Sequence, residues 1–254
     1  MTNMQIVGLG ALAGGTIYLG LPVARIKNPP RTLQGFLNAV ATGILFFLLY
    51  DVLSQAIDPV QAAVKSGSRG AAATDLVVLL AGLAVGLLAL VLFEQHFLRR
   101  EPGVAPSGTT LGYMIASGIG MHNLSEGLAI GASAATGHLP LAVLLIIGFG
   151  LHNMTEGFGI SAPLGGGASW SFVALAGLIG GGPTFFGTIL GINFHSTAVS
   201  VLFLALAAGS IMYVLSQLLP MIRRAQMQQL VMSGLILGFT VAFSTDLVLV
   251  AAGA

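Results

Sequence analysis

The chain has 254 residues, of which 56% are hydrophobic and only 7% are charged, and its formal net charge is +1 at pH 7. This composition excludes a single soluble domain, which would carry far more charge. The near-neutral balance gives no indication of a nucleic-acid partner. Cysteine is absent, so thiolate ligands are excluded and a metal site would need nitrogen and oxygen donors.

Apolar stretches of about 18 residues or more recur along the sequence and predict an all-α membrane protein. Pro, Gly or basic clusters separate eight transmembrane helices, which form one domain over residues 1–254. The predicted spans are 4–24, 33–54, 74–97, 108–134, 139–162, 168–191, 196–221 and 228–251. The break near residues 193–195 has the weakest signal, but the apolar stretch from 168 to 221 is too long for one crossing at about 1.5 Å per residue.

Two features inside the spans carry expectations of their own. The run Gly180-Gly181-Gly182-Pro183 is expected to interrupt the sixth span, as a packing kink or as part of a pathway. Irregular backbone at membrane depth is tolerated only where protein or a watery cavity covers it. Asp51 is expected to end the second span, where a solvated helix terminus explains its charge.

The distribution of lysine and arginine predicts the orientation of the chain. With the N-terminus outside, the first, third, fifth and seventh loops are cytoplasmic. Those loops hold Arg25, Lys27, Arg31, Arg99, Arg100, Arg223 and Arg224. The opposite loops hold only Lys65 and Arg69. This bias predicts that both termini lie on the non-cytoplasmic side. Basic residues follow the first span rather than precede it, so we expect no secretory signal peptide.

One short motif, His-Asn-x-x-Glu, occurs in both the fourth and the fifth span. Its copies are His122-Asn123-Leu124-Ser125-Glu126 and His152-Asn153-Met154-Thr155-Glu156. Residues i and i+4 share a helix face, so each copy presents an imidazole and a carboxylate together, with the Asn amide beside them. Ionisable groups in hydrocarbon are costly and mark functional sites. Imidazole, carboxylate and amide oxygen together suit a divalent transition metal.

For one copy alone, hydrogen bonding between helices would be a sufficient explanation. Two copies on consecutive helices joined by a short loop are expected to face each other at similar depth. Two carboxylates at close range in a low dielectric repel or share a proton unless a cation lies between them. We therefore interpret the pair of motifs as a metal site, with His122, Glu126, His152 and Glu156 as its ligands.

Taken together, the eight spans, the doubled motif with a following glycine, the glycine-rich sixth span and the Leu-Leu-Pro of the seventh span resemble the ZIP (Zrt-, Irt-like) family of divalent metal transporters, in its GufA-like bacterial branch. The resemblance covers the whole chain. It implies a homodimer in the bacterial inner membrane and an elevator-like motion. In that motion helices one, four, five and six carry the metal against a scaffold of the other four. Within this resemblance, Asn123 and Asn153 match positions that contribute to a second, adjacent metal in some members.

The chain departs from this family at two positions. Thr184 and Gln217 are neutral where many members carry Glu in the sixth and seventh spans. A second dication next to the first needs additional negative charge. We therefore expect one metal ion per protomer rather than a binuclear centre.

The predicted function is uptake of a divalent transition metal, which is cargo rather than a prosthetic group, and not an enzymatic reaction. Zinc is the leading candidate, and the ligand set also accepts Fe²⁺, Mn²⁺, Co²⁺ and Cd²⁺. The expected partners are the metal ion, membrane lipid and a second copy of the chain. Two alternatives stay open: an intramembrane metal-dependent hydrolase, and a metal-binding membrane protein that does not transport. An HExxH helix is missing, which weighs against the hydrolase.

Overall fold

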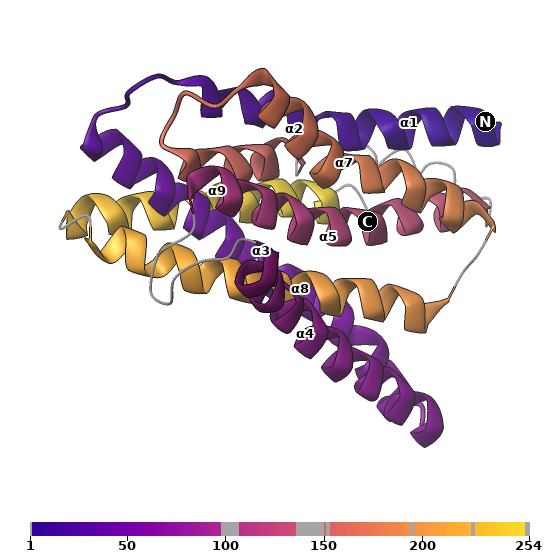
Figure 1. The fold of residues 1–254 in the computed structure, drawn as a ribbon. Helices are drawn as coiled ribbons and strands as arrows, with labels where there is room; N and C mark the ends of the chain where they lie inside the picture. The colour runs from indigo at the N-terminus through magenta and orange to yellow at the C-terminus, as the bar shows by residue number, and fades with distance from the viewer. Residues whose placement is uncertain are drawn as a thin grey trace.

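The computed structural model describes residues 2–97, 107–135, 150, 153–193, 196–224 and 227–251. These residues fold into helices joined by short turns, and none of them forms a β-strand (Figure 1). The predicted all-α fold class is thereby confirmed.

Six helices of the described residues are long and apolar enough to cross a membrane. They are Asn3–Arg25, Arg31–Lys65, Arg69–Leu92, Trp170–Asn193, Thr197–Pro220 and Gln228–Val248. They correspond to the first, second, third, sixth, seventh and eighth predicted spans. The fourth predicted span is the helix α5, Gly108–Ala135, which is long enough but rich in Gly, Ser and Thr and interrupted by the polar motif. Much of the fifth predicted span lies outside the described residues, and positions 153–161 of it are helical. The chain has the helices of an integral membrane protein.

The first predicted span is three consecutive pieces rather than one rod. It consists of α1 (Asn3–Gly15), α2 (Ile17–Gly20) and the 3-10 helix η1 (Leu21–Arg25). The junction is Thr16, whose hydroxyl lies 2.7 Å from the carbonyl oxygen of Ala13 and 2.6 Å from that of Gly150. A threonine hydroxyl that bonds backwards to a helix carbonyl competes with the helical ladder. Here it also ties this span to the fifth.

The expectation that Asp51 ends a helix was wrong. The helix α3 runs from Arg31 to Lys65, a length of 35 residues, and Asp51 lies well inside it. Pro59 does not stop the helix. The predicted span ended at residue 54 because the segment after it is more polar. The helix itself continues to Lys65, because helix formation depends on backbone propensity and not on hydropathy.

The expected interruption at Gly180-Gly181-Gly182-Pro183 is also absent. The helix α7, Trp170–Asn193, runs through these residues, with Pro183 inside it. The glycines serve close packing instead: a Cβ at Gly181 would collide with the carbonyl oxygen of Gly14 on α1. Small residues that let helix backbones approach are typical of membrane helix interfaces.

The weak break near residue 193 was predicted correctly. After α7 ends at Asn193, α8 runs from Thr197 to Arg224. The remaining helices are α4, Arg69–Phe97, and α9, Gln228–Ala251. A second 3-10 helix, η2 (Ala162–Leu164), leads into the glycine turn before α7.

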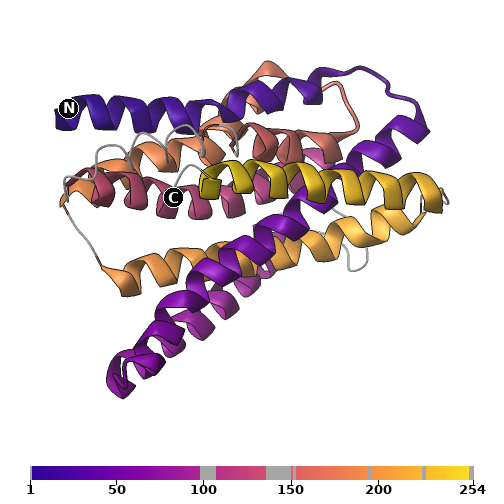
Figure 2. The ribbon, with the colours of Figure 1, turned by 180° about the vertical axis from the view of Figure 1, so that it is seen from behind.

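The helices pack as two groups. The first, the α5–α7 group, comprises α1, α2, α5, the 153–161 helix and α7; the second, the α3–α8 group, comprises α3, α4, α8 and α9. Figure 1 shows α1, α7 and α5 side by side along the upper part of the molecule, with α8 below them. Figure 2 shows α3 and α4 crossing the other helices obliquely and projecting beyond them.

Within each group, glycines bring backbones into direct contact. A Cβ at Gly127 of α5 would collide with the carbonyl oxygen of Thr184 on α7, and one at Gly43 of α3 would collide with that of Leu235 on α9. Between the groups, α5 and α8 contribute large side chains to one buried apolar cluster. Each group is therefore packed backbone to backbone. The contact between groups is made mainly by side chains, with a close approach of Gly118 on α5 to Ser210 on α8.

Candidate metal site

Both motifs lie on helices of the α5–α7 group. His122 and Glu126 are on α5, and Asn153 and Glu156 are on the 153–161 helix. His122, Asn153 and Glu156 are fully buried, and Glu126 is 4% exposed. The predicted ligand His152 lies outside the described residues. Three of the four predicted ligands are thus placed, all in the interior of the bundle.

In the first motif the helix places the imidazole and the carboxylate in contact. His122 Nε2 lies 3.2 Å from Glu126 Oε1, one helical turn further along α5. This is the pairing that the i, i+4 spacing predicts. Glu126 Oε2 is buried and has no hydrogen-bond partner among the described residues, so this carboxylate keeps an oxygen available for a ligand.

The side-chain amide of Asn123 joins the two motifs. Its Nδ2 lies 2.6 Å from Asn153 Oδ1, 3.0 Å from Glu156 Oε2 and 3.0 Å from the carbonyl oxygen of Gly180 on α7. The two motifs therefore meet in the interior of the helix bundle. The amide nitrogen also orients the Glu156 carboxylate.

The two predicted asparagines mainly hold helices together in this conformation. Asn153 donates to the carbonyl oxygen of Ala13 on α1, at 3.3 Å, while its own Oδ1 accepts from Asn123. Asn123 Oδ1 is buried and has no hydrogen-bond partner among the described residues. Of the two amide oxygens, that of Asn123 is the one left to face a ligand.

Two further carboxylates lie within electrostatic range of the motifs. Asp51 on α3 interacts with the charges of His122 and Glu156, and Asp246 on α9 interacts with that of Glu126. Asp51 was expected at a solvated helix end. An acidic residue inside an apolar stretch could have indicated a functional role for both positions, because such residues are costly in a membrane helix.

Among the described residues, no three His, Asp or Glu side chains are close enough together to form a complete metal-binding group. His122 and Glu126 are in direct contact, and Glu156 is connected to them through Asn123. The fourth predicted ligand, His152, lies outside the described residues.

Thr184 and Gln217, the two neutral positions discussed above, differ in environment. Thr184 on α7 is fully buried, and its Oγ1 has no hydrogen-bond partner among the described residues. It lies one turn after Gly180, whose carbonyl oxygen contacts Asn123. Gln217 lies on α8, in the other group, and is partly exposed. Only Thr184 is therefore next to the motifs.

No protein-family model matches this chain, and no curated protein matches it with significant similarity. The functional argument therefore depends on the chemistry of the site. Imidazole nitrogens and carboxylate oxygens together ligate divalent transition metals, with little preference among them. A buried site with this donor set in a membrane protein can hold a cation that hydrocarbon alone would exclude.

Proposed function

We propose that this chain transports a divalent transition metal ion, zinc in the first place, across a membrane, in the manner of a ZIP-family transporter. The observation that carries the proposal is the buried contact between His122 and Glu126 on α5, opposite Glu156 on the neighbouring helix. Ionisable residues inside membrane helices are rare and mark ion pathways. The proposed ligands are His122, Glu126, His152 and Glu156, with Asn123 and Asn153 beside them.

Charge balance favours one bound dication. Two carboxylates, Glu126 and Glu156, offset the charge of the ion, and the neutral imidazoles add none. The loaded site is then close to neutral, which lowers the cost of holding it in a low-dielectric environment. Asn123 is not one of the four proposed ligands, but its amide orients Glu156. Groups that hydrogen-bond to a metal ligand in this way commonly affect the affinity for the metal.

Transport also requires that the ion be released on the other side. The division into two helix groups supports this step, because the proposed ligands described here all lie in the α5–α7 group. Its contact with the α3–α8 group is made mainly by side chains of one apolar cluster. An elevator-type displacement of one group against the other would carry the ion without dismantling the site.

The setting of the protein is part of the same proposal. We place it in the bacterial inner membrane with both termini on the non-cytoplasmic side, on the support of the lysine and arginine asymmetry. A homodimer follows from the resemblance to the ZIP family.

Metal flux into liposomes tests the proposal against its two alternatives. Purified chain is reconstituted around a zinc-sensitive dye, and uptake is compared with that of Glu126→Gln/Glu156→Gln. Asp75→Asn is the matched control, because Asp75 is a mostly buried carboxylate on α4, outside the α5–α7 group. We expect uptake by the unmodified chain and the control, and none by the double variant.

Two other outcomes would replace the proposal. Zinc binding without flux indicates a metal-binding membrane protein that does not transport. Metal-dependent hydrolysis without flux indicates an intramembrane hydrolase. Wild-type uptake by a folded double variant would end the assignment of these carboxylates.

A further inference from the structure

The first span contacts different helices on the two sides of Thr16. Before this residue, the backbone of α1 lies against α7, where a Cβ at Gly14 would collide with the carbonyl oxygen of Gly181. After it, the backbone of α2 lies against the helix that carries the second motif, where a Cβ at Gly20 would collide with the carbonyl oxygen of Met154. Thr16 is therefore the point at which the backbone of the span passes from α7 to the helix of the second motif.

The hydroxyl of Thr16 lies between two carbonyl oxygens at this break. Its Oγ1 is 2.7 Å from the carbonyl oxygen of Ala13 and 2.6 Å from that of Gly150. A hydroxyl has one proton to donate, so the two carbonyls share it. The Ala13 carbonyl also accepts from Asn153 Nδ2, at 3.3 Å. The first span is thus tied to Gly150 and Asn153, which lie on either side of His152 in the sequence.

The same hydrogen bonds continue to a proposed ligand. Asn153 Oδ1 accepts from Asn123 Nδ2 at 2.6 Å, and that nitrogen lies 3.0 Å from Glu156 Oε2. Asn123 and Asn153 are fully buried, and Ala13 is 1% exposed. A buried amide that loses one partner has to rotate or leave a polar group unsatisfied, which is costly. A shift of the Ala13 carbonyl is therefore transmitted through the two asparagines to the Glu156 carboxylate.

Bending of the first span is not sufficient to explain the bonds of Thr16. A threonine hydroxyl that bonds back to its own helix can bend that helix. Thr42 on α3 shows the simpler case: its hydroxyl donates to the carbonyl oxygen of Asn38 in the same helix, and the helix continues without a break. The hydroxyl of Thr16 also reaches Gly150, 134 positions away in the sequence. It therefore joins two helices, which bending alone does not require.

We infer that Thr16 is a positioning residue of the proposed metal site: its hydroxyl fixes the Ala13 carbonyl, and through it the asparagine pair that orients Glu156. The inference rests on the proposed transport function. Thr16 acts through these neighbours and is not itself a ligand. Groups that orient a metal ligand commonly change metal affinity by about 10–100-fold. Thr16 acts from further away than Asn123, so we expect an effect at the lower end of this range.

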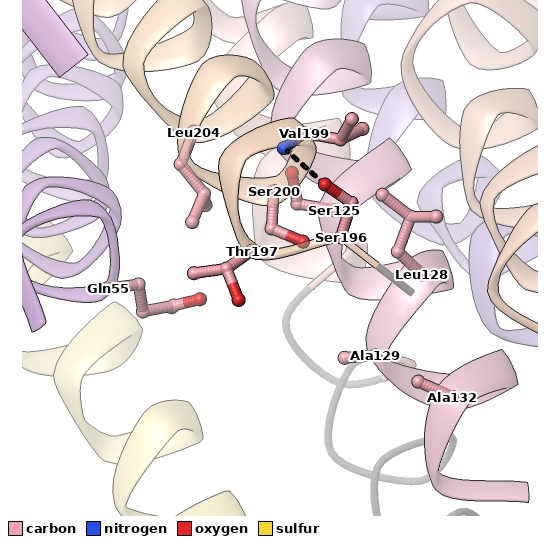
Figure 3. Close-up of a pocket in the computed structure, with 10 residues that line it drawn as sticks. All are labelled: Gln55, Ser125, Leu128, Ala129, Ala132, Ser196, Thr197, Val199, Ser200 and Leu204. Carbon is pink, nitrogen blue, oxygen red and sulfur yellow. Dashed lines mark hydrogen bonds between the residues drawn. The ribbon is translucent and has the colours of Figure 1, made fainter. Parts of the chain in front are cut away.

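The cavity next to the first motif does not involve Thr16. This cavity, of about 400 Å³, is lined in part by Ser125 (Figure 3). Its described lining residues come from α3, α5 and the beginning of α8, and none of them belongs to the first span. A substitution at Thr16 therefore leaves this lining unchanged, and a change in zinc affinity is attributable to the hydrogen bonds of Thr16.

Zinc titration of paired variants of the full chain in detergent tests this inference. Thr16→Val removes the hydroxyl and keeps the shape of the side chain, whereas Thr16→Ser keeps the hydroxyl. The matched control is Thr42→Val, because Thr42 is a fully buried threonine of the α3–α8 group. We expect zinc affinity to fall about tenfold in Thr16→Val and to stay within about twofold of the unmodified value in Thr16→Ser and in Thr42→Val.

A double variant tests the route by which Thr16 acts. In Asn123→Ala the connection to Glu156 is already broken, so adding Thr16→Val should change zinc affinity by less than about twofold. A further tenfold loss in the double variant would show that Thr16 acts by another route, and would overturn the inference.

The remaining outcomes separate this inference from the proposed function. Unchanged zinc affinity in Thr16→Val, whatever its melting temperature, overturns the inference and leaves the proposed function intact. An equal loss in Thr16→Ser does the same, because the hydroxyl is then not the cause. Thr16→Ala repeats the measurement with a smaller side chain if Thr16→Val does not fold. If the unmodified chain binds no zinc, the proposed function itself has failed, and the positioning role fails with it.

Discussion

The side-chain amide of Asn123 on α5 lies 3.0 Å from a carboxylate oxygen of Glu156 on the 153–161 helix. Both residues are fully buried. This contact connects the two copies of the motif directly and sets the orientation of one proposed ligand. It makes Asn123 as informative a target as the ligands themselves.

Replacing Asn123 by Ala should weaken both the fold and the metal site. The variant removes a buried donor that reaches Asn153, Glu156 and Gly180, so we expect a loss of about 1–3 kcal/mol in stability. Zinc affinity should fall about 10–100-fold, because Glu156 loses the group that orients it. Thermal unfolding in detergent and zinc titration measure the two effects. The matched control is Asn193→Ala, an exposed asparagine whose side chain donates to Ile189 within its own helix α7. Equal effects of both substitutions would contradict the bridging role.

Close packing between α5 and α7 should depend on Gly127. A Cβ at this position would collide with the backbone of Thr184, which cannot yield as a flexible side chain would. We expect Gly127→Ala to destabilise the chain by about 1–3 kcal/mol. At Gly8 of α1 an added Cβ meets nothing within 4 Å. Gly8→Ala should therefore leave the melting temperature unchanged or raise it slightly, since alanine favours a helix over glycine. A melting temperature unaffected by Gly127→Ala would contradict the tight contact.

Zinc binding should weaken as the pH falls. A proton on an imidazole or a carboxylate occupies the position that the metal needs, so protons and zinc compete for the same groups. Zinc affinity therefore falls as the pH is lowered and recovers as the pH is raised, until zinc hydroxide forms. Equilibrium zinc titrations at several pH values check this, with Glu126→Gln/Glu156→Gln as the variant that has lost the competing carboxylates. Affinity that stays constant from neutral to acidic pH would argue against these ligands.

The unmodified chain should hold one metal ion per protomer. Glu126 and Glu156 balance one dication, and Thr184 supplies only a hydroxyl next to them. Two dications a few ångströms apart repel strongly unless further negative charge is present. Thr184→Glu adds that charge at a buried position beside the motif and should raise the stoichiometry toward two. Metal analysis of purified protein and anomalous diffraction at the zinc edge measure it. Two strong neighbouring peaks in the unmodified protein would show that charge balance does not limit the site.

The orientation of the chain can be tested at three exposed positions. If the N-terminus is outside, a cysteine at Thr2 and one in the turn at Ser66 react with an impermeant reagent applied to whole cells, whereas one at Lys27 does not. The physical reason is the retention of basic loops in the cytoplasm. The opposite pattern, with Lys27→Cys labelled and the other two protected, would show that the topology is inverted. Lysed cells provide the control, since all three cysteines should then react.

Local information was sufficient for several features of this protein. The hydrophobic stretches indicated a helical membrane protein. The break near residues 193–195 was predicted from the length of the apolar stretch and from the lysine and arginine distribution. The contact between His122 and Glu126 followed from the geometry of one helix turn. Each of these depends on residues close in sequence, whose relation is set by the helix itself.

Other features depended on contacts between distant segments. Nothing local indicated that Asn123 would bridge to Asn153 and Gly180, that Asp51 would lie inside a long helix within range of the motifs, or that α7 would continue through Pro183. These outcomes arise because glycines let particular backbones approach, and the approach determines which side chains meet. The sequence by itself determined the membrane helices and the pairs of polar groups along them. Only the tertiary structure decided which of these polar groups face each other, because that depends on which helix backbones approach closely.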